Sequence, residues 1–152
     1  VATGQQEARL HGPSDDGSIS AMAFSPDGAV LAAGGKARVI RLWAFFSGKL
    51  LGTLVGHADY LECLAFSPDG KTLASGSRDE TVRIWSVTSG RELLRFEMSG
   101  LIKHLEFAPD GRTLAGAGTV GGRDAICLWS TIPAAVSAQR PSAGNGKSEP
   151  TQ

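Results

Sequence analysis

The stretch "FSPDG" at residues 24–28 decides the fold, because it returns unchanged at 66–70 and almost unchanged, as "FAPDG", at 107–111. The copies begin 42 and 41 residues apart. Each copy is followed by one tryptophan in the same part of the repeat, and these are the only tryptophans of the 152-residue chain: Trp43, Trp85 and Trp129. An internal period of about 40 residues indicates a repeat architecture, so the repeat is the unit that has to be explained.

Each copy contains four short β-like segments separated by turns. In the second copy the apolar run "LECLAF" ends at Phe66, and "SPDG" then forms a turn in which Pro68 fixes φ and Gly70 can adopt a positive φ. The segments "KTLASGS", "VRIW" and the more polar "RELLRF" follow, and "RDET" forms a turn in which Asp79 can bond its own backbone. Four strands in about 42 residues, with glycine-rich turns, are typical of a propeller blade. The expected fold is all-β, with three consecutive four-stranded antiparallel blades.

The chain resembles the WD-repeat β-propellers over about residues 5–132. The resemblance rests on "GH" at 56–57, on "FSPDGKTLASGSRDETVRIW" at 66–85 and on the recurring tryptophan. Near-consensus copies of this kind are similar to bacterial members of the family, whose arrays often follow a kinase or another regulatory domain. The chain departs from the family where an aspartate usually follows the tryptophan, because these positions are Ala44, Ser86 and Ser130.

The resemblance also implies a buried hydrogen-bonded chain in the second copy. In the family it joins the histidine of "GH", a serine of the second strand, the aspartate of the next turn and the tryptophan. Here these correspond to His57, Ser75, Asp79 and Trp85, with Ser77 as an alternative serine. The other copies depart at the equivalent positions, with Ala33 and Ala37 in the first and Gly116 and Met98 in the third. The implied role is structural, since a buried polar chain is tolerated only when its members are paired.

The propeller segment is expected to span residues 1–132, with blades at about 18–55, 60–97 and 101–132. Residues 133–152 hold no aromatic residue and little to bury, so they are expected to be a disordered tail.

The segment "GQQEARL" at 4–10 matches the fourth strand "GRELLRF" at 90–96, and "VATG" at 1–4 matches "VTSG" at 87–90. The chain is therefore expected to be the C-terminal part of a longer propeller protein, with 4–10 as the outer strand of a preceding or closing blade. The third copy has no fourth strand of its own. We expect the separate chain to exchange the 4–10 strand into a partner's third blade, or to aggregate.

The bulk composition argues against several classes of partner. Lys plus Arg and Asp plus Glu both number 15, so the chain has no net charge to attract nucleic acid or an anionic membrane. No apolar run approaches the length of a membrane span, and no signal-peptide pattern opens the chain. The two cysteines, Cys63 and Cys127, are expected to be small buried hydrophobic residues in a reducing, cytoplasmic compartment.

Three motifs suggest chemistry, and each has a simpler structural interpretation. His57, Ser75 and Asp79 could form a catalytic triad, but Ser75 lies within a strand and not on a nucleophile elbow. "AFSPDGKT" at 65–72 fits a phosphate loop loosely, but a strand and not a helix follows it. "GAGTVG" at 116–121 fits a dinucleotide fingerprint but is expected to form an enlarged hairpin turn. No catalytic, cofactor or metal site is expected.

The expected function is that of a non-catalytic scaffold which binds other proteins or peptides through one rim, because the strands are consumed by packing. Four residues of the second copy are candidate rim contacts, although they can equally be ordinary solvated loop residues: Asp59, Tyr60, Glu62 and Arg78. Tyr60 is the strongest candidate, since tyrosine is enriched at binding hot spots. Arg83 is expected to be solvated or paired between blades. The alternative is a propeller segment attached to, or forming part of, an enzyme.

Overall fold

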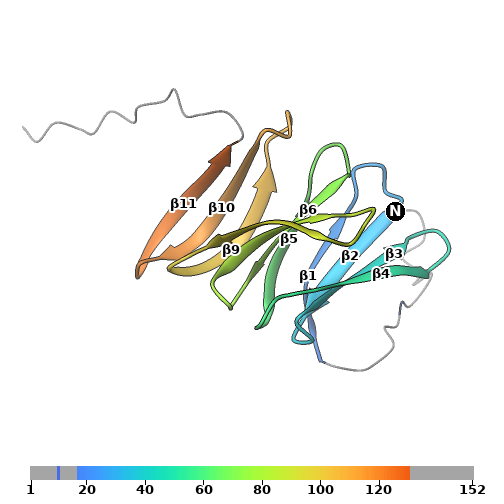
Figure 1. Cartoon of the computed structure of the whole chain (residues 1–152), viewed down its shortest axis with the longest axis horizontal. Helices are drawn as coiled ribbons and strands as arrows, with labels where there is room; N and C mark the ends of the chain where they lie inside the picture. Colours follow the sequence, from blue (N-terminus) through green and yellow to red (C-terminus); the bar gives the residue numbers. More distant parts are fainter. Residues whose placement is uncertain (1–9, 11–16, 131–152) are drawn as a thin grey trace, which may run out of the picture.

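The computed structural model of the protein describes Leu10 and residues 17–130, and every regular element in these residues is a β-strand. The strands form three antiparallel sheets that follow one another in chain order (Figure 1). The first sheet contains β1 (Ile19–Phe24), β2 (Val30–Gly35), β3 (Val39–Ala44) and β4 (Lys49–Val55). The second contains β5 (Leu61–Phe66), β6 (Thr72–Ser77), β7 (Thr81–Ser86) and β8 (Glu92–Glu97). The third contains β9 (Gly100–Phe107), β10 (Thr113–Val120) and β11 (Arg123–Ser130). The predicted all-β fold is confirmed.

Each sheet is a meander whose strands pair in the order in which they occur in the chain. The first strands of the sheets also contact one another in series, since β1 contacts β5 and β5 contacts β9. Within the described residues, β11 pairs with β10 on one side and has no strand on the other. The third sheet therefore ends at the position where β4 and β8 complete the first two.

The repeated turn has the conformation that its residues predict. Gly28, Gly70 and Gly111 have φ values of 70°, 69° and 68°. The Ser67 hydroxyl donates to Asp69 Oδ1 at 2.6 Å, and the Lys71 amide donates to the same oxygen at 3.0 Å. These hydrogen bonds, that of Ser67 above all, hold the pKa of Asp69 below its ordinary value. The motif recurs because each residue of the turn has a defined conformational or hydrogen-bonding role.

Of the glycines at 116–121 only Gly121 lies in a turn, so the enlarged turn that the sequence suggested does not form. Gly116 and Gly118 lie inside β10, and the turn itself consists of Gly121 and Gly122, both with positive φ. β10 and β11 pair without interruption from Thr113↔Ser130 to Val120↔Arg123. The extra residues of the third copy thus lengthen both strands, and a two-residue glycine turn closes the longer hairpin.

Apolar side chains between neighbouring sheets form the core. We call the side of a sheet that meets the previous sheet its front face and the side that meets the next sheet its back face. At the first junction the back-face residues Ile40, Leu42 and Leu54 pack with the front-face residues Leu61, Leu64 and Trp85. At the second, Val82, Ile84 and Phe96 pack with Ile102, Leu105 and Trp129. Both junctions use the same positions of the repeat, so one sequence pattern makes both.

Two expectations concern residues outside those that the structure describes. The predicted tail at 133–152 lies wholly outside them, and of the predicted strand at 4–10 only Leu10 lies within them.

Candidate functional site

The second sheet contains a buried chain of polar side chains that runs between its strands. The Trp85 Nε1–H donates to Ser75 Oγ at 2.8 Å, and Ser75 Oγ lies 2.7 Å from His57 Nε2. His57 Nδ1 lies 2.8 Å from Asp79 Oδ2. The chain joins β7 and β6 to the segment before β5 and the turn after β6, so it links parts of the blade that are distant in sequence.

The acceptors and donors of this chain fix the tautomer of His57. The Asp79 carboxylate can only accept, so His57 Nδ1 carries the proton and donates. His57 Nε2 is then an acceptor for the Ser75 hydroxyl, which in turn accepts from Trp85. Burial lowers the pKa of His57, and the neighbouring Asp79 offsets this only in part. At neutral pH the imidazole is therefore neutral and each of its nitrogens has a partner.

Asp79 is the member that holds the rest in place. Its Oδ1 accepts from the Thr81 hydroxyl at 2.7 Å and the Thr81 amide at 3.0 Å, and its Oδ2 accepts from the Ala58 amide at 2.9 Å. Burial alone raises the pKa of Asp79, but the hydrogen bonds from Thr81, Ala58 and His57 outweigh it and lower the pKa to about 2. Asp79 is ionised at neutral pH and fixes both the loop before β5 and the turn before β7.

Arg83 extends this chain, and its predicted solvated or inter-blade position is wrong. Its side chain is buried, its Nε donates to Thr81 Oγ1 at 3.2 Å, and its Nη1 donates to Glu92 Oε2 at 2.6 Å. Its Nη2 lies 3.7 Å from Asp79 Oδ2. The sequence showed Arg83 as a polar residue alternating with apolar ones, but it did not show that the buried carboxylate of the same blade faces it.

Ser75 and Ser77 have different partners. Ser77 Oγ donates to the backbone oxygen of Asp59 at 2.9 Å and accepts from the Asp79 amide at 3.1 Å. Only Ser75 reaches both His57 and Trp85. In the third sheet Gly116 replaces this serine, and a Cβ there would lie 2.8 Å from Cζ3 of Trp129. The indole of Trp129 thus occupies the space that a serine side chain would need.

The connectivity of Ser75, His57 and Asp79 is that of a catalytic triad, but its surroundings do not suit nucleophilic catalysis. Ser75 is 0% exposed, so no substrate carbonyl can reach its hydroxyl. The same oxygen also accepts from Trp85, so hydrogen bonds to Trp85 and His57 hold it inside the blade. A nucleophilic serine needs access and an adjacent oxyanion hole. The arrangement can hold the loop before β5 in one conformation, and this structural role is the one that its geometry supports.

The candidate rim residues lie together at the edge of the second sheet next to Asp79. The Arg78 guanidinium lies over the Tyr60 ring, 5.7 Å from its centroid, and Arg78 Nε donates to Glu62 Oε1. The Tyr60 amide donates to Asp59 Oδ1 at 2.7 Å. Tyr60 and Arg78 are exposed. Ser77 and Asp79 bind the backbone beneath this rim, so it rests on the buried polar chain.

Comparison with known protein families gives a match to the family described as "WD domain, G-beta repeat", over residues 4–44 and 48–86. The two matched segments together cover more than half of the chain. The chain belongs to the WD40 repeat family. Each matched segment ends with the third strand of a blade, and the second starts just before β4, so residues 4–10 hold the same place in the repeat as β4. A search of curated proteins found no match.

WD40 repeats generally mediate protein–protein interaction and are typically non-catalytic. The described part of this WD40 chain contains no group of three or more His, Cys, Asp or Glu residues that could hold a metal. Burial raises the pKa of the Cys63 thiol to about 12, so the thiol is a poor nucleophile.

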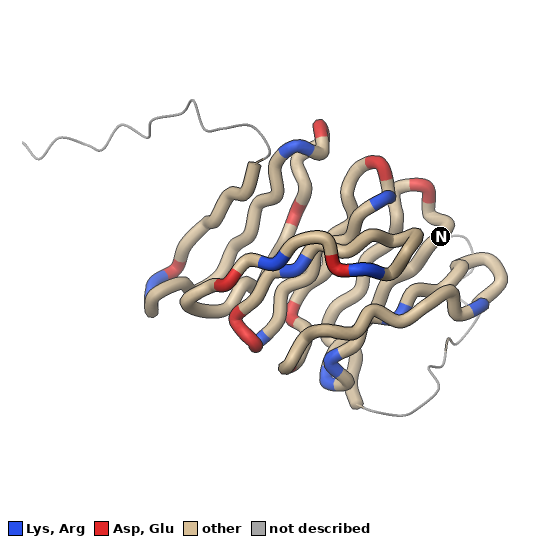
Figure 2. The backbone as a smooth tube through the Cα atoms, in the orientation of Figure 1, with Lys and Arg blue, Asp and Glu red and all other residues tan. Residues whose placement is uncertain are grey.

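None of the described residues forms a helix long and apolar enough to cross a membrane. Acidic and basic residues are interspersed over the blades (Figure 2).

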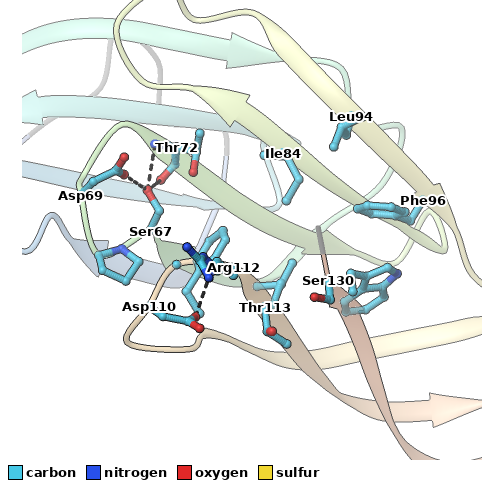
Figure 3. A pocket seen from close by; sticks show the side chains of 15 residues that line it. Ser67, Asp69, Thr72, Ile84, Leu94, Phe96, Asp110, Arg112, Thr113 and Ser130 are labelled. Atoms are coloured by element: carbon cyan, nitrogen blue, oxygen red, sulfur yellow. Dashed lines mark hydrogen bonds between the residues drawn. The ribbon is translucent and has the colours of Figure 1, made fainter. Parts of the chain in front are cut away.

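A cavity of about 640 Å³ opens between the second and third WD40 blades (Figure 3). Leu94 and Phe96 of β8 form one wall, and Trp129 and Ser130 of β11 lie opposite. The rings of Phe96 and Trp129 are 5.5 Å apart. The cavity lies beside the edge of β11 that has no described neighbour, so it is continuous with the place of a fourth strand.

Proposed function

We propose that this chain is a non-catalytic platform for protein–protein contact and that it forms part of a larger regulatory or signalling protein. In this proposal the rim of the second blade, formed by Asp59, Tyr60, Glu62 and Arg78, binds an exposed segment of the partner. The membership of the WD40 family supports the class of function, and the geometry of the rim supports the choice of site.

The observation that carries the choice of site is the pairing of an exposed tyrosine with an exposed arginine on a fixed backbone. Tyr60 and Arg78 are stacked, and Glu62 holds the guanidinium in this position. Tyrosine and arginine are the residue types that carry binding energy most often, and side chains fixed in advance lose less entropy on binding. The buried polar chain thus supports binding indirectly, by holding the loop that presents Tyr60.

The alternative, that the segment forms part of a propeller enzyme, has less support. Ser75 is inaccessible, and the Glu62 carboxylate of the rim is paired with Arg78.

The proposal is tested with peptides selected from a random displayed library on the wild-type chain. Tyr60→Ala and Arg78→Ala should each weaken the affinity of the selected peptides by about tenfold or more, as expected for hot-spot residues. The matched control is Thr88→Ala, on the opposite edge of the same blade, which should leave the affinity unchanged. Peptides that bind Tyr60→Ala and Arg78→Ala as tightly as wild type would show that this rim is not the binding surface.

A further inference from the structure

The front face of the first sheet exposes the same apolar positions that the other two sheets bury. Ile19 is 62% exposed, whereas Leu61 and Ile102 at the matched positions are 0% and 2% exposed. Met22 is likewise exposed, whereas its equivalents Leu64 and Leu105 are buried. The difference in exposure does not come from the residue types, since all of these residues are apolar. The face is built as a blade junction whose other half is absent from the described residues.

The back face of the third sheet shows the reciprocal pattern. Ile126 is 76% exposed, whereas Ile40 and Val82 at the matched positions are 1% and 0% exposed. Leu128 is also exposed, and its equivalents Leu42 and Ile84 are buried. At both internal junctions these back-face positions pack against the positions of Ile19 and Met22 in the next sheet. The two exposed faces therefore complement each other in the way that the buried faces do.

Leu10 indicates where the segment at 4–10 belongs. A Cβ at Gly48, in the turn between β3 and β4, would lie 3.2 Å from Leu10 Cδ2. In the next blade, a Cβ at the matched Gly90 would lie 3.5 Å from Leu54 Cδ2 on β4. Leu10 thus packs on the front of the first blade as Leu54 packs on the front of the second. It takes the place of a fourth strand belonging to the blade in front.

We propose that two copies of this chain join head to tail, with the back face of each third blade on the front face of the partner's first blade. Residues 4–10 of each copy then lie beside β11 of the other and complete its third sheet. For the 152-residue chain by itself, the occupant of the free edge is a second copy, because the exposed front and back faces are the two halves of one junction. Unpaired strand edges and exposed apolar faces both favour such association.

The number of copies follows from closure of the ring. A head-to-tail contact uses two different surfaces, so it closes only when the rotation brings the last surface to the first. Propellers contain about four to eight blades. With the three described sheets of the 152-residue chain, two copies give a ring of six blades and three copies would give nine, so the assembly of this chain is a dimer with two equivalent junctions. Each junction also covers the free edge beside the cavity between β8 and β11 (Figure 3).

The mass of the 152-residue chain in solution tests the assembly. Light scattering at micromolar concentration should give twice the mass of one chain. Ile19→Asp and Ile126→Asp should each give monomers, because each places a carboxylate in both junctions. Leu93→Asp, an exposed apolar position on the middle blade, is the control and should remain dimeric. A wild-type monomer, or a mixture of open oligomers, would overturn the proposal.

Mixing the two variants separates loss of the junction from loss of the fold. A heterodimer of Ile19→Asp with Ile126→Asp has one junction that carries both substitutions and one that is wild type. The mixture should therefore recover dimer, whereas a face-to-face contact between like surfaces, or misfolding of either variant, would give no recovery.

A disulfide tests the strand pairing itself. The register of the second sheet pairs Arg83 with Arg95, and the matched pair across the new junction is Cys127 with Arg9 of the partner. Cross-strand neighbours are close enough for a disulfide. Oxidised Arg9→Cys protein should run as a covalent dimer on a non-reducing gel, and adding Cys127→Ser should abolish this band. A covalent dimer that survives Cys127→Ser, or no covalent dimer at all, would exclude the proposed register.

Discussion

At the scale of single residues, Asp79 determines whether the buried polar chain stabilises or destabilises the fold. Its carboxylate satisfies the His57 ring, the Ala58 amide and both donors of Thr81. Asp79→Ala would leave these donors without an acceptor, so we expect the free energy of unfolding to fall by about 1–3 kcal/mol. The urea denaturation midpoint at pH 7 measures this loss.

The control for Asp79→Ala is Asp69→Ala. Asp69 also accepts hydrogen bonds from a hydroxyl and an amide, but it is exposed, so water can replace its carboxylate.

The pH of the denaturation measurement affects the expected result. The pKa of Asp79 in the fold is about 2, below its ordinary value of 3.8, so its stabilisation is complete above about pH 4 and is lost as the pH falls towards 2. Equal urea denaturation midpoints for wild type and Asp79→Ala at pH 7 would mean that the buried polar chain does not stabilise the blade.

The residue types and their spacing predicted some members of the buried polar chain and did not predict the others. The family resemblance pointed to His57, Ser75, Asp79 and Trp85, which the structure brings into hydrogen-bonding contact. The resemblance gave no sign of Thr81, Arg83 or Glu92. The Arg83–Glu92 pair depends on which side chains face one another across β7 and β8, and this follows from strand register and not from a local motif. The bonds from Thr81 to Asp79 are local, but the apolar and polar spacing of the strand did not mark Thr81 as their donor.

At the scale of elements, the turns between the second and third strands carry strain that a substitution can relieve. Glu80 has a φ of 61°, and Arg38, at the same place in the first blade, has a φ of 63°. Side chains larger than that of Asn rarely adopt this left-handed conformation. Glu80→Asn should raise the free energy of unfolding by up to about 1 kcal/mol, because asparagine tolerates the conformation. Thermal melting detects this change.

Thr88→Asn is the matched control for Glu80→Asn, since Thr88 is an exposed turn residue of the same blade whose φ is not positive. It should leave the melting temperature unchanged. A melting temperature for Glu80→Asn at or below that of wild type would show that the left-handed turn stores no strain.

Strand positions were the most predictable feature at this scale. The runs at 61–66 and 71–77 became β5 and β6 almost residue for residue, because an apolar strand and a Pro–Asp–Gly turn each have a narrow choice of conformation. The hairpin of the third blade was less predictable. Its glycines at 116 and 118 suit a turn or a strand equally in isolation, and only packing of Trp129 over Gly116 favours the strand.

At the scale of the whole molecule, one alanine distinguishes the proposed junction from the two inside the chain. At the first internal junction a Cβ on Gly34 would lie 2.3 Å from Leu61 Cδ1, and at the second a Cβ on Gly76 would lie 3.1 Å from the backbone oxygen of Ile102. The matched residue of the third sheet is Ala117, paired with Ile126 as Gly34 is with Ile40. In the dimer its methyl group stands where Ile19 of the partner should pack, so this junction is looser than the internal ones.

Ala117→Gly should therefore have opposite effects on folding and on association. Glycine within a strand lowers the stability of the monomer by about 0.5–1 kcal/mol. Removing the methyl group lets Ile19 of the partner approach as Leu61 approaches Gly34, so the dissociation constant should fall roughly fivefold, which corresponds to about 1 kcal/mol. Ala125→Gly is the control, because it makes the same change on the front face of β11 and should destabilise the fold without tightening the dimer. Sedimentation across a concentration series gives the dissociation constant of each protein. If Ala117→Gly weakens the dimer as it weakens the fold, the partner's first blade does not pack at this position, and the equivalence between internal and intermolecular junctions fails there.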